Sequence, residues 1–365
     1  MKTILQLCTS PDKGGLELYF ADLSNQLTKN FNLYCGLGMH SKLTTYLDPI
    51  IPTFLIHKTF HYLPLLAAWK LSKIIDKKKI EVIHLHWNKD LPLAIFSKLF
   101  SKQKLKVILT RHMQFPAKKD SFYHRFIYKN LDSIIAITKT MQNDLKRFIP
   151  LSVQPYISTI YLGVDSIETL KDETRDLARK PYAEKNEFLI GLFGRISPYK
   201  GQRFLIEALN MAKTHNLPFK AIIVGHAMNE NYLQELKKEV NLLSLENHII
   251  FTGFVTNPKE LMQACDVVVL TTVEETFGLV LIEAMSVGIP VIGSNRGGVP
   301  EIIEDQYNGL LFESQNSDDL FYKLKELYDD PEKHLHFGEN AKKSALNKFS
   351  KQKHIEQLVQ FYKSL

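Results

Sequence analysis

Cysteine is scarce in this chain of 365 residues. The three cysteines, Cys8, Cys35 and Cys265, lie far apart, and the sequence has neither a CxxC pair nor a Cys/His cluster. This pattern argues against a disulfide framework and against a structural zinc site. It is typical of a protein that folds in a reducing cytosol.

Long apolar runs are missing as well. No stretch of about 18 apolar residues occurs, so no membrane-spanning helix is expected. The N-terminal sequence MKTILQLCTSPDKGG has one early lysine and a short apolar run before polar residues. It is typical of a first β-strand rather than of a signal peptide. We therefore expect a cytoplasmic protein.

Several functional signatures are also absent. The sequence contains no GxGxxG, no GxSxG and no GxxxxGK[ST]. Their absence disfavours a nicotinamide-dependent enzyme, an α/β-hydrolase and a P-loop NTPase. No aromatic-rich RNA motif or helix–turn–helix spacing is present, so a nucleic-acid partner is not expected.

The composition that remains is that of a globular α/β protein. Apolar residues make up 45% of the chain and charged residues 23%, which is the balance of a folded rather than a disordered protein. The length favours two domains. Strand-like and helix-like segments alternate along the whole chain, as expected of stacked βα units.

One segment, residues 271–301, carries the most information. It places Glu275 and Glu283 eight positions apart across a turn, followed by an apolar helical run that begins at Leu279 and ends near Gly288. Backbone N–H groups at such a helix start can hold an anion. Two carboxylates beside a bound phosphate suggest a ligand with hydroxyl groups on both sides of its phosphates, such as a nucleotide-sugar.

This segment resembles the C-terminal signature of the family-4 retaining glycosyltransferases. The Phe277-Gly278-Leu279 triplet and the run 297–301, GGVPE, match that signature too. The resemblance implies the GT-B fold, with two Rossmann-like domains facing each other across a cleft. It also implies that Glu275 lies near the hydroxyls of the donor sugar and that Glu283 binds the ribose.

A second loop resembles the diphosphate loop of the same family. It runs GRISPYKG over residues 194–201, between a strand and a helix. Gly194 permits a tight turn, and Arg195 and Lys200 bring two positive charges that can neutralise a nucleotide diphosphate without a metal ion. No DxD motif follows an apolar strand, so no metal site is expected.

Three further positions are assigned by resemblance. Gly14-Gly15 resembles the N-terminal glycine loop, whose amides approach the donor phosphate or the acceptor. His112, at a predicted strand end, matches a histidine that faces the donor sugar, although Met113 replaces the usual aspartate. Phe254 and Val255 follow a strand at the point where the family binds the base.

Two more histidines, His84 and His86, alternate along a strand and share one face. A structural or acceptor-site role is expected for them rather than metal ligation.

The predicted domain organisation follows the family pattern. Residues 1–164 form an acceptor-binding domain, residues 165–187 a partly helical linker region, and residues 188–350 the nucleotide-sugar-binding domain. The segment 157–164 is expected to be the closing strand of the first domain. Residues 351–365 are expected to form a helix that packs back on the first domain.

The charge is divided unevenly between the two halves of the chain. Residues 1–163 contain 23 Lys and Arg against 10 Asp and Glu, so +13, and the rest contains 23 against 29, so −6. A basic half favours an anionic partner such as an acidic membrane surface or a phosphorylated acceptor.

The sequence therefore predicts a metal-independent hexosyltransferase that uses a UDP-sugar, in preference to a GDP-sugar, as a substrate and needs no cofactor. Its acceptor would be a glycan or a glycolipid of surface polysaccharide or lipopolysaccharide biosynthesis. Peripheral binding at the inner face of the membrane would accompany that role. A nucleotide-sugar epimerase, a sugar phosphorylase and a non-catalytic glycan-binding protein are the alternatives that the motifs leave open.

Overall fold

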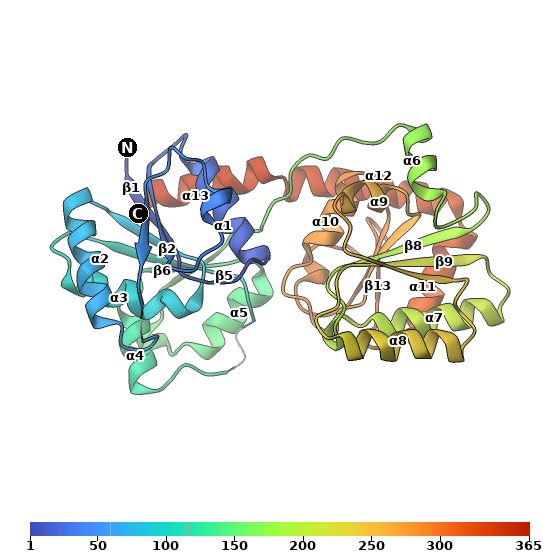
Figure 1. Ribbon diagram of the computed structural model, residues 1–365, viewed down its shortest axis with the longest axis horizontal. Coiled ribbons are helices and arrows are strands. Elements are labelled where there is room, and N and C mark those ends of the chain that lie inside the picture. The colour runs from blue at the N-terminus through green and yellow to red at the C-terminus, as the bar shows by residue number, and fades with distance from the viewer. Residues whose placement is uncertain (59, 115–116) are drawn as a thin grey trace. The chain divides into compact units, whose positions relative to one another are not determined.

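The computed structural model describes residues 1–58, 60–114 and 117–365 (Figure 1). The chain forms two compact units. Unit 1 consists of Met1–Tyr161 together with His354–Leu365, and unit 2 consists of Leu162–Lys353.

Unit 1 is built on a seven-stranded sheet with the order β3-β2-β1-β4-β5-β6-β7. Its strands are β1 (Thr3–Cys8), β2 (Asn32–Gly38), β3 (Thr53–Ile56), β4 (Val82–Leu85), β5 (Lys106–Arg111), β6 (Ser133–Ala136) and β7 (Tyr156–Thr159). Its helices are α1 (Gly15–Leu27), α2 (Leu65–Lys78), α3 (Leu91–Phe100), α4 (Phe122–Lys129), α5 (Lys139–Phe148) and α13 (Lys351–Ser364). Every strand pair in this sheet is parallel.

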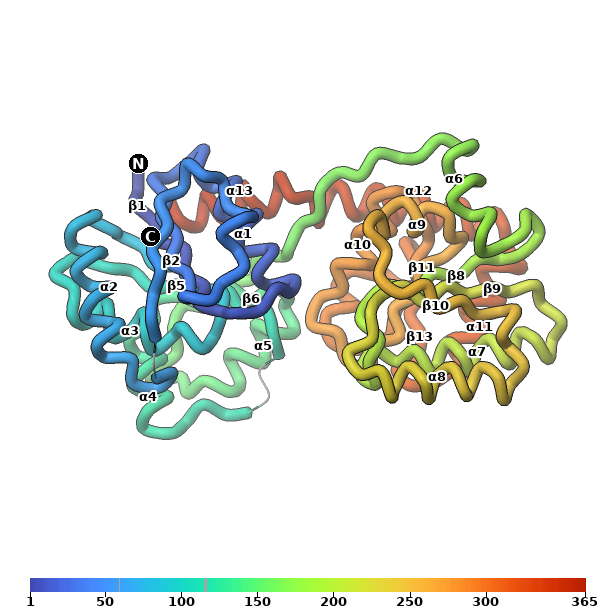
Figure 2. Tube along the Cα trace, in the orientation of Figure 1, coloured from blue at the N-terminus to red at the C-terminus, as the bar shows by residue number. Residues whose placement is uncertain are grey.

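Helices cover both faces of the unit 1 sheet, which is why a central strand such as β1 is buried along its whole length. Helices α1 and α13 share one core: Phe20 and Leu27 of α1 pack in the same cluster as Leu358 and Tyr362 of α13. Helices α2 and α3 pack against each other elsewhere in the unit, and α4 contacts α3 (Figure 2). The C-terminal helix thus belongs to the core of unit 1.

Unit 2 is built on a six-stranded parallel sheet with the order β10-β9-β8-β11-β12-β13. Its strands are β8 (Phe188–Phe193), β9 (Phe219–Val224), β10 (Ile249–Gly253), β11 (Val267–Leu270), β12 (Val291–Ser294) and β13 (Leu310–Phe312). Its helices are α6 (Asp172–Arg179), α7 (Gln202–Thr214), α8 (Glu230–Leu242), α9 (Pro258–Gln263), α10 (Leu279–Ser286), α11 (Ser317–Asp329) and α12 (Pro331–Lys348). In Figure 1, α7, α8 and α11 lie on one side of this sheet, and α9, α10 and α12 lie on the other.

The strand order reverses once in each sheet. In unit 1 the chain leaves β1 toward β2 and β3 and later returns to pair β4 with the other side of β1. In unit 2 the same reversal occurs between β8 and β11. Ligands of open parallel sheets bind outside the carboxyl ends of the strands at such a reversal. The two reversals therefore indicate where each unit's functional groups should gather.

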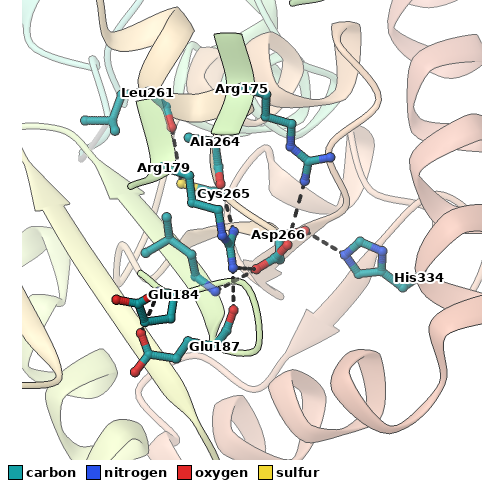
Figure 3. A network of polar contacts seen from close by, with 10 residues as sticks. Arg175, Arg179, Glu184, Glu187, Leu261, Ala264, Cys265, Asp266 and His334 are labelled. Carbon is teal, nitrogen blue, oxygen red and sulfur yellow. Dashed lines mark hydrogen bonds and ion pairs between the residues drawn. The ribbon is translucent and has the colours of Figure 1, made fainter. Parts of the chain in front are cut away.

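The segment 165–187, predicted to be a linker region, contains α6 and is tied to unit 2 by a polar network (Figure 3). The guanidinium of Arg179 lies 2.9 Å from a carboxylate oxygen of Asp266 and donates to the carbonyl of Ala264 at 3.0 Å. The same Asp266 oxygen accepts the backbone N–H of Leu189 at 2.7 Å. His334 of α12 contacts the Asp266 carbonyl at 2.8 Å. The network joins α6, β8, β11 and α12.

The closing strand of the first domain is shorter than the sequence pattern indicates. Strand β7 covers Tyr156–Thr159, whereas the expected strand covered residues 157–164. In the rest of that expected strand, residues 160–164, Val164 forms a bridge to Ser350. Gly163 lies so close to this segment that a Cβ atom on it would be 2.6 Å from the Ser350 carbonyl. The chain therefore leaves the sheet at residue 159, and the apolar pattern beyond it belongs to a crossing connection.

Two helix boundaries follow the sequence signals closely. Thr138 is the N-cap of α5, and its hydroxyl accepts the N–H of Met141 at 3.1 Å. Helix α10 ends before Gly288, whose φ of +85° closes the helix. None of the helices among the described residues combines the length and the apolar character that a bilayer span requires.

Candidate functional site

The two motif loops of unit 2 lie side by side at the reversal of strand order. Loop 194–201 follows β8, and loop 271–278 follows β11. Thr271 donates from its hydroxyl to the carbonyl of Lys200 at 2.9 Å, and the N–H of Val273 donates to the carbonyl of Tyr199 at 3.1 Å. Position 201 requires glycine, because its φ is +69° and a Cβ atom there would lie 2.1 Å from the Thr271 carbonyl oxygen. Backbone contacts thus fix the two motifs against each other.

A charged pair joins the two loops. Lys200 Nζ lies 2.7 Å from Glu275 Oε2, and the two side chains are 27% and 18% exposed. Both groups are accessible enough to meet a ligand and buried enough for their interaction to be stronger than a surface pair. The lysine predicted to bind phosphate and the glutamate predicted to bind sugar hydroxyls therefore share one ion pair.

Arg195 differs from Lys200 in its surroundings. Its side chain is exposed, and one guanidinium nitrogen contacts the sulfur of Met228 at 3.8 Å. Its backbone is held by Gln202, a fully buried side chain whose amide donates to the Arg195 carbonyl at 3.0 Å. Gln202 Oε1 has no hydrogen-bond partner among the described residues. Sequence reasoning did not identify Gln202, because a glutamine at a helix start carries no motif of its own.

Three glycines line the carboxyl edge of the sheet. Gly194 follows β8, Gly225 follows β9 and Gly253 ends β10. Their φ angles are all positive, at +149°, +146° and +69° respectively. A Cβ at Gly225 would lie 2.0 Å from the Gly194 carbonyl, while the positions above Gly194 and Gly253 are open. The edge therefore exposes backbone rather than side chains, which lets a ligand approach closely. The sequence indicated only the first of these glycines as a site residue.

Helix α10 starts where the sequence predicts, with Gly278 as its N-cap at φ +106°. Leu279, the first helical residue, is partly exposed, but Phe277 is buried and its ring packs edge-to-face on Phe349. The side chain of Phe277 is thus a core group, so any contact that it makes with a ligand comes from its backbone.

Glu283 lies in the second turn of α10. Its side chain is mostly buried, and burial raises the pKa of its carboxyl above the ordinary value, with Lys259 opposing the shift. A carboxylate that burial has partly desolvated binds hydroxyl donors more strongly than one in water. Glu283 can therefore serve as a hydroxyl acceptor, as predicted for the ribose.

The GGVPE run supports the first glutamate. The N–H of Gly298 donates to the Glu275 carbonyl at 2.8 Å. Gly297, with φ +63°, lies so close that a Cβ there would be 2.0 Å from the same carbonyl. The run therefore holds the backbone of Glu275 in place, which gives a physical reason for its position in the motif.

Phe254 and Val255 directly follow Gly253 at the end of β10. The ring of Phe254 is 75% exposed. It is therefore available for stacking on a base, and it makes no contribution to the core of unit 2.

In unit 1 the glycine loop is already engaged by a carboxylate. Gly14 donates its N–H to Glu17 Oε2 at 2.9 Å, and Ser10 donates its hydroxyl to Glu17 Oε1 at 2.5 Å. The buried, negative Glu17 at the start of α1 offsets the positive end of that helix. Gly15 has open space above it. This loop suits a hydroxyl-bearing ligand better than a phosphate, so the predicted phosphate contact is less favoured at Gly14 than an acceptor contact.

A buried ion pair lies beside that loop. Lys58 Nζ is 2.6 Å from Asp90 Oδ1, and the side chains are 4% and 0% exposed. Asp90 also accepts the N–H of Thr9 at 2.7 Å and its hydroxyl. Lys58 lies over the ring of Trp87 at 4.8 Å. The ion pair joins the segment after β3 to the loop after β4, and the bonds from Thr9 to Asp90 join the loops after β1 and β4, which are the two loops at the reversal in unit 1.

His112 belongs to a buried histidine network. His86 Nδ1 lies 3.4 Å from His112 Nε2, and His86 Nε2 contacts Gln6 Oε1 at 2.7 Å. Tyr19 packs edge-on against His112 with 4.9 Å between ring centres, and its hydroxyl bonds to His354 of α13 at 2.8 Å. Helix α13 therefore supports the predicted catalytic histidine through Tyr19.

Three histidines of this network, His84, His86 and His112, are neutral at physiological pH. Burial lowers the pKa of His84 and of His112 to about 3, and it lowers the pKa of His86 well below the ordinary value. His84 is held between Tyr362 and Thr110, 2.7 Å from the latter's hydroxyl. A neutral His112 can hydrogen-bond a sugar hydroxyl but cannot supply a positive charge. Among the described residues, no three His, Cys, Asp or Glu side chains are arranged to hold a metal ion.

The chain matches two sequence families. "Glycosyl transferases group 1" matches residues 174–344, and "Glycosyltransferase Family 4" matches residues 13–167. Together they cover both units. The chain therefore belongs to the family-4 glycosyltransferases.

Relatives extend over nearly the whole length of the chain. The N-acetyl-alpha-D-glucosaminyl L-malate synthase of Bacillus anthracis is 24% identical over 99% of this chain and 97% of its own. The UDP-Gal:alpha-D-GlcNAc-diphosphoundecaprenol alpha-1,3-galactosyltransferase of Escherichia coli is 25% identical over 91% of this chain and 88% of its own.

Solved structures give the fold. HepE of Anabaena, crystallised in complex with UDP and glucose, is 25% identical over 100% of both chains with a TM-score of 0.84. A glycosyltransferase of Rickettsia africae has a TM-score of 0.87 at 21% identity over 100% of this chain and 98% of its own. The predicted fold class is confirmed: the chain has the GT-B fold of α/β glycosyltransferases, with two parallel sheets.

Proposed function

We propose that this glycosyltransferase moves a hexose from a UDP-sugar to a lipid-linked or other glycan acceptor, with retention of the anomeric configuration and without a metal ion. The observation that carries the proposal is the Lys200–Glu275 pair, which joins the two motif loops at the carboxyl edge of unit 2. HepE, a structural relative, was crystallised with UDP and glucose, and this favours UDP as the nucleotide.

Each residue has a distinct part in the proposed binding mode. Arg195 and Lys200 bind the diphosphate, with the α10 N-terminus nearby supplying backbone N–H groups. Glu275 accepts hydrogen bonds from the sugar hydroxyls, and Glu283 accepts them from the ribose. Phe254 stacks on the base, and the Val255 backbone binds its edge. The open glycine edge lets the phosphates approach the backbone.

The proposed reaction occurs on one face of the sugar. The acceptor hydroxyl oxygen forms a bond to the anomeric carbon while the bond from that carbon to the phosphate oxygen breaks. The departing phosphate oxygen takes the acceptor proton, so UDP leaves with the added proton and no enzyme base is needed. Arg195 and Lys200 stabilise the charge that develops on the diphosphate. His112, which is neutral, orients the sugar by hydrogen bonding.

The acceptor proposal rests on unit 1 and on the relatives. The printed name of the Escherichia coli relative gives a diphosphoundecaprenol acceptor, and a Campylobacter jejuni relative is named for a diphospho-undecaprenol acceptor as well. Lys77, Lys78 and Lys79 are exposed at the end of α2. A basic unit 1 fits an acceptor that is carried in an anionic membrane. These observations favour surface polysaccharide biosynthesis at the cytoplasmic face.

A thermal-shift screen with UDP-, GDP- and ADP-sugars tests the donor. A cognate donor at a hundred times its dissociation constant should stabilise the fold by about 2.7 kcal/mol, and EDTA should not change that stabilisation. Turnover with an acceptor should give a product whose anomeric proton coupling in NMR matches that of the donor. Release of free UDP together with an epimerised sugar in the absence of acceptor would support the epimerase instead.

A further inference from the structure

Unit 1 has an unusual group of exposed apolar side chains. They lie just before α2, on its first turns and at the start of α4. We call this group the apolar ridge; its members and their exposed fractions are Phe60 (69%), Tyr62 (74%), Leu63 (57%), Leu66 (68%), Trp69 (50%) and Phe122 (89%). Scattered single apolar residues are normal on a protein surface, but a contiguous group marks an interaction surface.

A contact between two tyrosines makes the ridge contiguous. The hydroxyl of Tyr123 donates to the carbonyl of Tyr62 at 2.7 Å, and the two rings lie 6.0 Å apart. This contact brings the start of α4, and with it Phe122, to the segment before α2. Leu66 and Trp69 lie three positions apart on α2, so they share its outer side, and Leu63 directly precedes Pro64, the N-cap of the helix.

Helix α2 has two opposite faces. Ala68, Leu71, Ser72 and Ile75 are buried against the unit. The outward face is apolar and aromatic over the first turns and then basic, with Lys70, Lys73 and Lys77 exposed. Residues 60–79 contain five lysines and one acidic residue, Asp76, a net charge of +4.

The one acidic residue of α2, Asp76, makes hydrogen bonds within unit 1. The Asp76 carboxylate accepts the hydroxyl of Ser101 at 2.6 Å and the N–H of Lys102 at 3.0 Å. The Ser101 hydrogen bond is the main reason that the pKa of Asp76 is lowered. Lys73 also lies near enough to Asp76 to contribute to that lowering. One carboxylate thus offsets only part of the charge of five lysines, and the segment keeps its net charge of +4.

Lysine and aromatic groups also meet directly at the ridge. Lys73 Nζ lies 5.5 Å from the ring centre of Trp69. Tryptophan and tyrosine prefer the interface between water and hydrocarbon, where one end of the ring is dry and the other wet. Lysines beside them extend toward anionic headgroups while their methylene stems remain in the apolar layer.

We propose that the apolar ridge inserts into the interface of an anionic membrane, with the α2 lysines holding the adjacent headgroups. The proposal rests on the proposed function, since it assigns the surface through which the enzyme reaches a lipid-linked acceptor. Charge alone would bring the basic unit to the bilayer only by adsorption. The ridge adds a buried apolar contact, so the attachment persists when salt screens the lysines.

Liposome co-sedimentation and tryptophan quenching test the ridge on the full chain. The chain has two tryptophans, Trp69 and Trp87. Vesicles of phosphatidylglycerol and phosphatidylcholine with brominated acyl chains should quench the fluorescence of the wild type. The Trp69→Phe variant should sediment with the vesicles as well as the wild type does but should lose most of that quenching.

Two variant sets separate insertion from adsorption. L66S combined with W69S should weaken vesicle binding about tenfold or more at every salt concentration, because it removes the apolar contact. K70Q combined with K73Q should weaken binding about fivefold per lysine at low salt, and less as salt rises. Leu242→Ser on α8, whose side chain is 85% exposed in unit 2, is the matched apolar control and should leave vesicle binding unchanged.

Three results would overturn the proposal. The first is vesicle binding that the lysine variant abolishes and the L66S/W69S variant leaves intact. The second is no vesicle binding at low salt. The third is a wild-type dimer in light scattering that the L66S/W69S variant converts to a monomer, since the ridge would then be a protein contact. Titration of UDP into the same samples distinguishes a failure of the proposed function from a failure of the membrane proposal. Absence of UDP binding would count against the proposed function, whatever the vesicle experiments show.

Discussion

At the scale of single residues, the proposed chemistry of unit 2 depends on charged side chains that pair with each other in the free protein and would bind the ligand when it is present. Lys200 and Glu275 neutralise each other at 2.7 Å, while Arg195 stands exposed beside them. A diphosphate would draw Lys200 toward itself and free Glu275 for the sugar hydroxyls. The pair thus keeps both groups in place before the donor arrives.

Replacing either cation should weaken catalysis. Arg195→Ala or Lys200→Ala removes a charge-assisted contact worth about 1.5–3 kcal/mol, which corresponds to about a 10- to 150-fold loss of kcat/KM. Lys200→Ala should cost more, because it also leaves Glu275 without its partner. Steady-state kinetics with the cognate donor measure both effects. Unchanged kinetics in correctly folded variants would contradict the assignment of the diphosphate loop.

Glu283 should make nucleotide binding depend on pH. Burial raises the pKa of its carboxyl, and only the ionised form accepts two hydroxyl hydrogen bonds. Affinity for UDP should therefore fall as the pH drops through this raised pKa and be constant above it. The same shift affects stability. At a pH below the pKa of the unfolded state, Glu283 is protonated in both states and the folded protein has no cost for burying its charge. That cost appears, and stability falls, as the pH rises through the raised pKa of the folded state.

Calorimetric titrations of UDP at several pH values measure this dependence. The Glu283→Gln variant should bind more weakly at neutral pH and show no such acid-side loss. If wild type and variant lose affinity in parallel on the acid side, Glu283 is not the group responsible.

At the scale of elements, the sequence predicted the loops and helices of the site better than it predicted the connections between them. The stop at Gly288 and the cap at Thr138 are local signals, since each depends on a few neighbouring residues. Beyond the end of β7 at Thr159, in contrast, Gly163 packs closely against Ser350, a residue far away in the sequence. Likewise, the contact of Gly297 with Glu275 needs the fold to exist before it can be recognised.

The histidines show the same limit. His84 and His86 were placed on one strand face from their alternation, and both lie on β4 or at its end. Their partners come from other elements: Tyr362 from α13, Thr110 from β5 and Gln6 from β1. No sequence period relates these positions, so the contacts between them could not be predicted from the sequence.

The polar network around Asp266, which holds α6 against the rest of unit 2, can be tested by substitution. Asp266→Ala leaves the buried Arg179 guanidinium without its carboxylate and removes an acceptor for the Leu189 N–H. Unit 2 should lose about 3 kcal/mol of stability, measured by urea unfolding followed by far-ultraviolet circular dichroism. Lys325→Ala on α11, which breaks only an exposed ion pair with Asp329, should cost less than about 0.5 kcal/mol. Equal effects of the two substitutions would show that the network does not anchor the helix.

At the scale of the whole molecule, the two units should respond differently to acid. In unit 1, burial lowers the pKa values of His84, His86 and His112 far below the ordinary value in the folded state, so these three histidines take up protons on unfolding. Their contribution to stability is present above the unfolded pKa, near 6.5, and is lost as the pH falls toward the folded value. Each histidine contributes a slope of about 1.4 kcal/mol per pH unit. Unit 1 should therefore unfold steeply between about pH 6 and pH 4.

Tryptophan fluorescence isolates this transition, because both tryptophans lie in unit 1. Urea unfolding at a series of pH values should give an uptake of about three protons. An uptake of fewer than about one proton would mean that the histidines are not buried as neutral groups.

The claim on which the proposed function depends is that the carboxyl edge of unit 2 binds a uridine diphosphate. Isothermal titration of UDP into the wild type, the Arg195→Ala/Lys200→Ala double variant and the Lys325→Ala control tests it in one experiment, in buffer that contains EDTA. We predict saturable binding of equal affinity to the wild type and the control, and a loss of about a hundredfold or more in the double variant. Absence of UDP binding to the wild type, or equal binding to all three proteins, would contradict it.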